Sequence, residues 1–299
     1  MAAWPRRVGG RSVRRVLLGV VAVVVLGYGA IIGWLKWHER EMVFATAASH
    51  RRAEGVVPPG GELLSLPTQG GLQLAALRFR PDPRQDKGYW ILHLHGNSDS
   101  AFSPMQIAHC ERLTRLGVGA LCFDYRGFGR SPGEVSEAAM LEDAEAAYQW
   151  LRGQGIAEDR ILLWGHSLGS GPAVHLASRH PAAALVLFGA FTSIPEAAAD
   201  RYPWLPVRWL VGVHFDSRRL MPAVRMPVVL AHAETDRVIA FHHAHDLLAA
   251  AKGPKRLLVL VDRTQDGFGG HVEALYDQID VLRDALPEVF GRAMQLPLR

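Results

Sequence analysis

The sequence predicts an α/β fold: a mostly parallel, doubly wound sheet with helices on both faces and a short cap, preceded by one transmembrane helix. Three observations predict it. Short apolar runs alternate with longer amphipathic stretches from residue 62 onward. Most of the short runs are apolar at every position, as in strands that are covered on both faces. A separate, uncharged apolar run near the N-terminus is long enough to cross a bilayer as a helix.

Length and composition narrow the class of protein. The chain has 299 residues, of which 49% are hydrophobic and 21% are charged. This composition supplies a buried core and excludes a chain that is disordered throughout. The length fits one large domain with an N-terminal addition. The formal net charge is +4, but the basic residues form no stripe interleaved with aromatic residues, so we expect no nucleic-acid partner.

The N-terminal addition begins with a basic tail, residues 1–15, and continues as a signal-anchor helix over residues 16–37. The arginines before the apolar run predict a cytoplasmic N-terminus, with the rest of the chain on the periplasmic, luminal or extracellular side. Trp34 and Trp37 stand where indole rings settle at a membrane interface. The basic residues that set this orientation are Arg6, Arg7, Arg11, Arg14 and Arg15.

A cleaved signal peptide is the main alternative for this segment, because Ala45, Thr46 and Ala47 resemble a cleavage site. Cleavage would give a secreted protein. The anchor is preferred because the apolar run is longer than the usual core of a signal peptide and a charged stretch separates it from these residues. A buried core helix fits less well, since the run has no polar stripe.

Residues 38–61 are polar, end in two prolines and two glycines, and are predicted to tether the helix to a globular domain over residues 62–299. Amphipathic helices are expected at 136–151 and 168–179. Residues 194–226 are rich in proline and aromatic residues, have no clear strand, and are predicted to form the short cap. The expected strands are LQLAALRF, YWILHLH, VGALCFDY, RILLWGH, ALVLFGA, PVVLAHA and RLLVLVD.

Signatures of cofactor and metal chemistry are absent from the sequence. The phosphate-binding pattern G-x-x-x-x-G-K-[ST] does not occur, and no cluster has metal-ligand spacing. Cys110 and Cys122 are expected to be buried small hydrophobic residues, with one disulfide or a reactive thiol as the less favoured alternatives. We therefore expect neither a cofactor nor a metal.

Ser167 is the candidate nucleophile. It lies in Gly165-His166-Ser167-Leu168-Gly169, directly after an apolar strand and before a helical stretch. A G-x-S-x-G pattern in this context predicts a sharp strand-to-helix turn that raises the serine above the sheet. The two glycines remove Cβ atoms that would collide with neighbouring chain segments, and the dipole of the following helix points at the site.

A serine alcohol needs a base and an acid that orients the base, and after such a turn they follow in the order Ser, Asp, His. Asp236 comes just after a predicted strand and is the candidate acid, with Glu234, Asp262 and Asp266 as alternatives. His271 follows two glycines after the last predicted strand and is the candidate base. Three further histidines are expected on one helix that does not face the nucleophile: His242, His243 and His245.

Two backbone amides, those of Asn97 and Leu168, are expected to form an oxyanion hole. Asn97 ends an H-G-N stretch after a strand, where an early loop supplies one donor, and Leu168 follows the nucleophile. His95 is expected to fix this loop. Asp124 and Arg126, in D-Y-R-G-F-G-R-S, are expected to brace the neighbouring loop rather than to catalyse.

Together these motifs resemble the α/β-hydrolase family over roughly residues 62–290. The resemblance rests on H-G-N at 95–97, D-Y-R-G-F-G-R-S at 124–131, G-H-S-L-G at 165–169, Asp236 and His271. With the N-terminal anchor and F-T-S-I-P at 191–195, the chain is similar to the membrane-anchored α/β-hydrolase domain-containing subgroup. That resemblance implies lysophospholipase, monoacylglycerol lipase or protein depalmitoylase activity, and therefore an acyl ester substrate.

The sequence thus predicts a membrane-tethered serine hydrolase that cleaves lipid-like acyl esters or thioesters through Ser167, His271 and Asp236 and an acyl-enzyme. The expected partners are a small-molecule acyl ester and the bilayer, through residues 16–37. A peptidase or amidase with the same triad is one alternative, because the triad does not distinguish them. A catalytically silent binding module is another. Oligomeric state, acyl chain length and head group are not specified by the sequence.

Overall fold

Eight strands form one sheet in the order β1-β2-β4-β3-β5-β6-β7-β8. The computed structural model describes residues 10–261, 270–271 and 278–287. β1 pairs antiparallel with β2 and β2 antiparallel with β4, while the strands from β4 to β8 are parallel. The strands are β1 (Gly61–Pro67), β2 (Gln73–Phe79), β3 (Tyr89–Leu94), β4 (Val118–Phe123), β5 (Ile161–His166), β6 (Ala184–Phe188), β7 (Val228–Ala233) and β8 (Lys255–Leu260).

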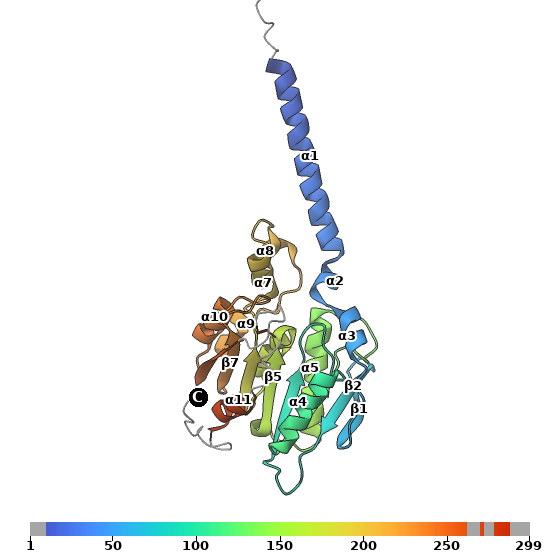
Figure 1. The fold of residues 1–299 in the computed structure, drawn as a ribbon, viewed down its shortest axis with the longest axis vertical. Helices are drawn as coiled ribbons and strands as arrows, with labels where there is room; N and C mark the ends of the chain where they lie inside the picture. Colours follow the sequence, from blue (N-terminus) through green and yellow to red (C-terminus); the bar gives the residue numbers. More distant parts are fainter. Residues whose placement is uncertain (1–9, 262–269, 272–277, 288–299) are drawn as a thin grey trace, which may run out of the picture. The chain divides into compact units, whose positions relative to one another are not determined.

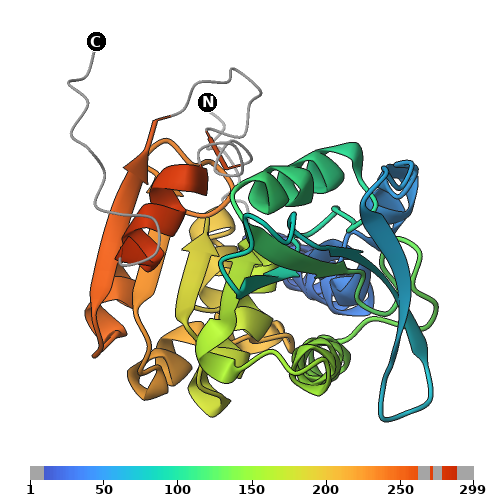
Figure 2. The ribbon, with the colours of Figure 1, turned by 90° about the horizontal axis from the view of Figure 1, so that it is seen from below.

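Helices cover both faces of this sheet. Figure 2 shows α4 and α11 on one face and α5 and α6 on the other. The helices of the chain are α1 (Gly10–Trp37), α2 (Glu39–Val43), α3 (Thr46–Arg52), α4 (Pro104–Arg115), α5 (Glu137–Gly153), α6 (Ser170–Arg179), α7 (Ile194–Arg201), α8 (Val207–Leu210), α9 (Ser217–Leu220), α10 (His242–Ala250) and α11 (Gln278–Ala285). Figure 1 gives their positions along the chain.

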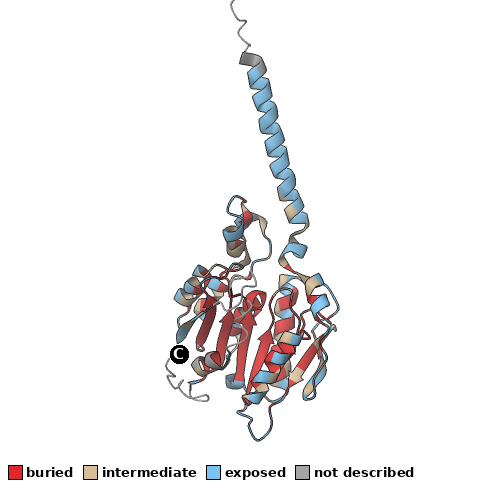
Figure 3. Cartoon of the chain, in the orientation of Figure 1, coloured by how far each residue is buried: buried red, intermediate tan, exposed pale blue. Residues whose placement is uncertain are grey.

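The predicted α/β class and doubly wound sheet are confirmed. Every residue of β3, β4, β5, β6 and β7 is buried, which is why their sequences are apolar throughout rather than alternating. Figure 3 shows these strands as the buried centre of the domain. All seven expected strands form, and α5 and α6 fall within or close to the two predicted helical ranges. β1 is an additional strand, at the antiparallel edge of the sheet.

The expected short cap lies between β6 and β7. It consists of α7, α8, α9 and a 3-10 turn, Met221–Ala223, and contains no strand. Pro195 occupies the first turn of α7, where its nitrogen needs no hydrogen-bond acceptor. The hydroxyl of Ser193 accepts from the N–H of Glu196 and caps the same helix.

The N-terminal apolar helix forms a separate unit. The chain divides into two compact units, Met1–Val43 and Phe44–Arg299. Within α1, the 25-residue segment Val13–Trp37 has a mean hydropathy of 2.6 and is long and apolar enough to cross a membrane, by length and composition. A signal sequence passes the same test. Arg6 and Arg7 of the predicted basic tail lie outside the described residues.

The structure differs from the predicted tether over residues 38–61, because the chain from Phe44 onward packs on the catalytic domain. Phe44 is buried, and Ser49 of α3 is fully buried. The Ser49 hydroxyl donates to the carbonyl of Asp99 and accepts from the N–H of Gly129, 2.9 Å away. Polar composition suggested a solvated linker, but these polar groups bind backbone groups of two loops instead.

The two cysteines also differ from expectation. Both are fully buried, as predicted, but Cys110 of α4 and Cys122 of β4 form a disulfide. They are 12 residues apart in the sequence. The helix α4 follows β3 and packs against β4, the next strand along the chain. That helix-on-strand packing brings the two side chains together, and no cysteine spacing rule describes it.

Candidate active site

The nucleophile elbow has the geometry that the sequence predicts. Ser167 directly follows β5 and adopts the left-handed region with φ 49°. This conformation is costly for a residue with a side chain and is found at functional turns. An added Cβ on Gly165 would lie 2.7 Å from Cβ of Ala173, and one on Gly169 would lie 2.1 Å from the carbonyl oxygen of Leu94. Both glycines are therefore required by close packing.

Gly169→Ala is expected to lower the free energy of unfolding by about 3 kcal/mol, since its new methyl group would meet a backbone oxygen that has no room to move. Urea unfolding measures this loss. Gly153→Ala in α5 is the matched control, because nothing lies within 4 Å of its added Cβ, and it should change stability by less than about 1 kcal/mol. Equal stabilities of the two variants would contradict the packing argument.

The structure brings Ser167, His271 and Asp236 together in one hydrogen-bonded chain. Nε2 of His271 lies 2.9 Å from Oγ of Ser167, and Nδ1 of His271 lies 2.7 Å from Oδ2 of Asp236. A carboxylate accepts only, so Nδ1 carries the proton and Nε2 is left to accept from the serine hydroxyl. All three residues are buried. Glu234 is exposed, and Asp262 and Asp266 lie outside the described residues.

Asp236 is held as a charged acceptor by a second set of donors. Its Oδ1 accepts from the N–H groups of Val238 and Ile239 at 2.8 and 2.9 Å. Nε2 of His232 lies 3.1 Å from Oδ2. Burial opposes the charge, but the hydrogen bonds from His232 and His271 outweigh it and hold the pKa of Asp236 well below its usual range. Sequence reasoning missed His232, which lies in β7 like any buried strand residue.

His166, the residue before Ser167, forms a hydrogen bond with the backbone of His271. Burial, followed by the charge of His271, lowers the pKa of His166 to about 4, so its imidazole is neutral at pH 7. Its Nε2 lies 3.1 Å from the backbone carbonyl of His271 and donates to it. An added Cβ on Gly96 would lie 2.6 Å from Nδ1 of His166, so glycine in H-G-N permits this approach. The sequence pattern alone assigns no role to His166.

The two loops that carry the expected oxyanion donors lie side by side. Leu94 and Gly165 pair in register between β3 and β5, so the turns after these strands meet. Oδ1 of Asn97 accepts from the N–H of Ala45 at 2.7 Å and from that of Ser98 at 3.1 Å. The side chain of Asn97 thus joins its loop to the segment before α3. The role of the backbone amides of Asn97 and Leu168 as oxyanion donors stays a prediction.

Asp124 braces this loop, as expected. Its carboxylate is fully buried and accepts from the N–H groups of Ala101 and Arg130 at 2.7 and 2.8 Å. Burial raises the pKa of Asp124, and these donors oppose the rise. Arg126 instead binds Asp143 of α5, with Nε 2.9 Å from Oδ1. Both side chains act on loops and helices and not on the serine.

One group of side chains has metal-ligand chemistry. Asp200 of α7 and His242 and His243 of α10 place one ligand atom each within 4.8 Å of the others. Nδ1 of His243 accepts from the N–H of Thr192 at 3.2 Å, so the ring proton is on Nε2, which faces Asp200 at 3.0 Å. A protonated Nε2 cannot ligate a cation, so the neutral imidazole of His243 and the carboxylate of Asp200 form a polar contact between α10 and the cap. His242 and His243 lie on one helix, as predicted.

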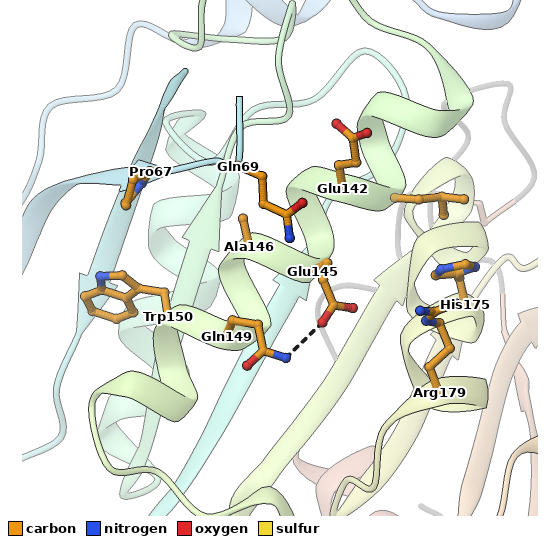
Figure 4. A pocket seen from close by; sticks show the side chains of 10 residues that line it. Pro67, Gln69, Glu142, Glu145, Ala146, Gln149, Trp150, His175 and Arg179 are labelled. Carbon is orange, nitrogen blue, oxygen red and sulfur yellow. Dashed lines mark hydrogen bonds between the residues drawn. The ribbon is translucent and has the colours of Figure 1, made fainter. Parts of the chain in front are cut away.

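Figure 4 shows a hollow between α5 and α6 that lies apart from the triad. The carboxylate of Glu145, which lines it, accepts from Gln149 at 2.8 Å and from His180 at 2.8 Å. None of its side chains is a serine, threonine or cysteine, so it offers no nucleophile for acyl transfer. The residues that line it are Pro67, Gln69, Leu141, Glu142, Glu145, Ala146, Gln149, Trp150, His175 and Arg179.

Known proteins with similar sequences identify the family of this chain. The family described as "Serine aminopeptidase, S33" matches residues 89–221, which include the elbow and the D-Y-R-G loop. An uncharacterized protein from Mycobacterium tuberculosis is 34% identical over 275 residues, which cover 91% of this chain and 95% of that protein. The chain belongs to the α/β-hydrolase family of serine hydrolases. It is an esterase- or lipase-like member of that family.

Two further similarities describe this hydrolase. The lysophosphatidylserine lipase ABHD12 from Danio rerio is 34% identical over 183 residues, which cover 54% of this chain and 48% of that protein. The chain therefore spans about half the length of the lipase that it matches. The esterase domain of a Rhodothermus marinus protein has a TM-score of 0.57 and 24% identity, and covers 77% of this chain and 100% of that domain. That likeness concerns the fold.

Proposed function

We propose that this hydrolase is tethered to a membrane and cleaves carboxylic esters of lipid-like substrates through Ser167, His271 and Asp236. The observation that carries the proposal is the hydrogen-bonded chain from Oγ of Ser167 through His271 to Asp236, with distances of 2.9 and 2.7 Å. A serine with this partner is activated by general base catalysis, which an isolated serine is not. Asp236 holds the tautomer that the base needs.

The reaction runs in two acyl-transfer steps. Oγ of Ser167 attacks the ester carbonyl carbon while Nε2 of His271 takes the hydroxyl proton. The amides of Asn97 and Leu168 stabilise the oxyanion, and Asp236 stabilises the imidazolium. The carbon–oxygen bond to the leaving alcohol breaks, and the alcohol takes the proton from His271. Water then repeats the sequence on the acyl-enzyme, with His271 as base, and releases the carboxylic acid.

Lipid-like esters are the proposed substrate class, for two reasons. A lysophosphatidylserine lipase is among the relatives, and the sequence resembles a subgroup with lysophospholipase activity. Thioesters belong to the same proposal, because the attack and the oxyanion are the same. An amide substrate would also require protonation of a poorer leaving group, and the esterase and lipase relatives favour the ester.

The proposed topology has α1 in the bilayer and the catalytic domain on the non-cytoplasmic side. The arginines before the apolar segment favour this orientation. The Cys110–Cys122 disulfide fits an oxidising compartment. Cleavage after Ala47 would remove Phe44, which is buried, and Ala45, whose N–H binds Asn97. The folded role of these residues therefore supports an uncleaved anchor.

Labelling of the full-length membrane protein with a fluorophosphonate tests the proposal, because the probe captures an activated serine without knowledge of the substrate. Wild type is expected to be labelled and Ser167→Ala to be unlabelled. Ser178→Ala is the matched control, since this serine of α6 only bonds its own helix, and it should be labelled like wild type. Folded wild type that stays unlabelled would leave a silent binding module as the function.

A further inference from the structure

The cap and the first residues of the catalytic domain lie at the same end of the sheet. β3, β5 and β6 are parallel, so their carboxyl ends meet at one edge. The cap begins after β6, and Asn97, which follows β3, binds the N–H of Ala45. Figure 1 shows α3, α7 and α8 at this end of the strands. Ser167 follows β5 at the same edge.

The cap presents aromatic side chains to solvent there. Trp209 of α8 is 89% exposed, and Trp204 and Tyr202 in the preceding turn are 62% and 38% exposed. We call these three side chains the cap tip. Within the described part of the catalytic domain, they are the exposed aromatic residues. Phe215 of the same cap is instead buried against Gly171, so packing of the domain accounts for it and not for the cap tip.

The cap tip has the composition of a surface that enters a membrane interface. Residues 202–213 read YPWLPVRWLVGV and contain one arginine and no acidic residue. Tryptophan and tyrosine settle at the head-group level, where the ring is apolar and its N–H or O–H stays hydrated. Arg208 pairs with Glu196 at 2.8 Å and so offsets the repulsion between this carboxylate and anionic head groups.

The chain length keeps this edge of the sheet close to a bilayer. Residues 38–43 are the only ones between the end of the apolar helix at Trp37 and the packed residue Phe44. The seven steps from Trp37 to Phe44 span at most about 25 Å even when fully extended. A bilayer that holds the apolar helix is therefore no farther than this length of chain from Phe44, and the next residue, Ala45, binds Asn97 in the loop after β3.

We infer that the cap tip inserts into the interface of the bilayer that holds α1, so that the hydrolase takes its ester from that lipid surface rather than from water. This inference rests on the proposed anchor and ester hydrolysis. The partner is the lipid surface itself: aromatic rings enter the interface, and the acyl ester reaches Ser167 at the same edge of the sheet.

Quenching of Trp209 by brominated phosphatidylcholine tests the insertion, with the full-length protein in liposomes. The emission of Trp209 is taken as the difference between wild type and Trp209→Phe. We expect lipid brominated at the head-group end of its acyl chains to quench it by at least about half, because an indole at the interface lies next to those bromine atoms. Trp150, at the far end of α5, is the matched control through Trp150→Phe, and its emission should be unaffected. Unquenched Trp209 emission would overturn the inference.

Kinetics give a second readout that separates this inference from the proposed function. Trp209→Ser is expected to lower hydrolysis of a lysophospholipid in liposomes about tenfold, through lost interfacial binding, and to leave hydrolysis of a short water-soluble ester within about twofold. Leu63→Ser, an exposed apolar residue of β1, should change neither rate. Equal loss for both substrates would overturn insertion. Absence of fluorophosphonate labelling in wild type would instead overturn the hydrolase, whatever the quenching shows.

Discussion

Ser167→Ala is expected to lower kcat for ester hydrolysis by about six orders of magnitude, and His271→Ala by a similar factor. The two residues form one proton-transfer unit, with Nε2 of His271 2.9 Å from the hydroxyl. Without the hydroxyl there is nothing for the base to activate, and without the base the hydroxyl is a poor nucleophile. The double variant is therefore expected to be no slower than either single variant.

Turnover of a short chromogenic ester by purified full-length protein, with and without each substitution, measures these factors. Thermal unfolding checks that each variant is folded. His245→Ala is the matched control for histidine loss, because His245 is an exposed residue of α10 whose ring contacts Phe241, and it should keep wild-type kcat. Losses that multiply in the double variant would contradict a single unit and would require another nucleophile.

The fold and the juxtaposition of Ser167, His271 and Asp236 could be predicted because both leave local traces in the sequence. Strands buried on both faces must be apolar at every position, so each run from β3 to β7 is visible by itself. The elbow requires two glycines around Ser167, since Leu94 and Ala173 leave no room for a Cβ at either site. Chain order then selects Asp236 and His271, and the structure places both within hydrogen-bond distance.

The segment that folds onto the catalytic loops could not be predicted, because its contacts are distant in sequence. Ala45 binds Asn97, 52 residues away, and Ser49 binds Gly129, 80 residues away. Each polar group in residues 44–52 looks solvated when read locally. Only the tertiary structure reveals that backbone groups of two loops bind the side chains of Ser49 and His50.

The roles of His166 and His232 could not be predicted, for a different reason. The chain has 14 histidines, and imidazole serves equally well as packing, donor or base. His166 donates from Nε2 to the backbone carbonyl of His271, and burial keeps its ring neutral. His232 reaches Asp236 because it lies near the end of β7, four residues before Asp236. Burial and tautomer decide these roles, and neither has a sequence pattern.

Asp236→Asn is expected to lower kcat by about four orders of magnitude while leaving the fold intact. The amide of asparagine can donate a proton where the carboxylate only accepts, so it favours the His271 tautomer with the proton on Nε2. That tautomer cannot accept the proton of Ser167, although every atom occupies nearly the same place. Asp200→Asn is the matched control, since Asp200 pairs with histidines of α10, and its kcat should stay near that of wild type.

Asp236→Asn is also expected to change how the free energy of unfolding depends on pH. Hydrogen bonds from His232 and His271, acting against burial, hold the pKa of Asp236 below its unfolded value, so the charged carboxylate stabilises the folded state at neutral pH. That contribution is present above the unfolded pKa of about 4 and is lost as the pH falls toward the lower folded pKa. The wild type should therefore exceed Asp236→Asn in free energy of unfolding at pH 7, with the gap unchanged at pH 5 and smaller at pH 3, in urea titrations. A gap that widens in acid would mean that the carboxylate is protonated in the folded enzyme, and the assignment of Asp236 as the charged orienting acid would fail.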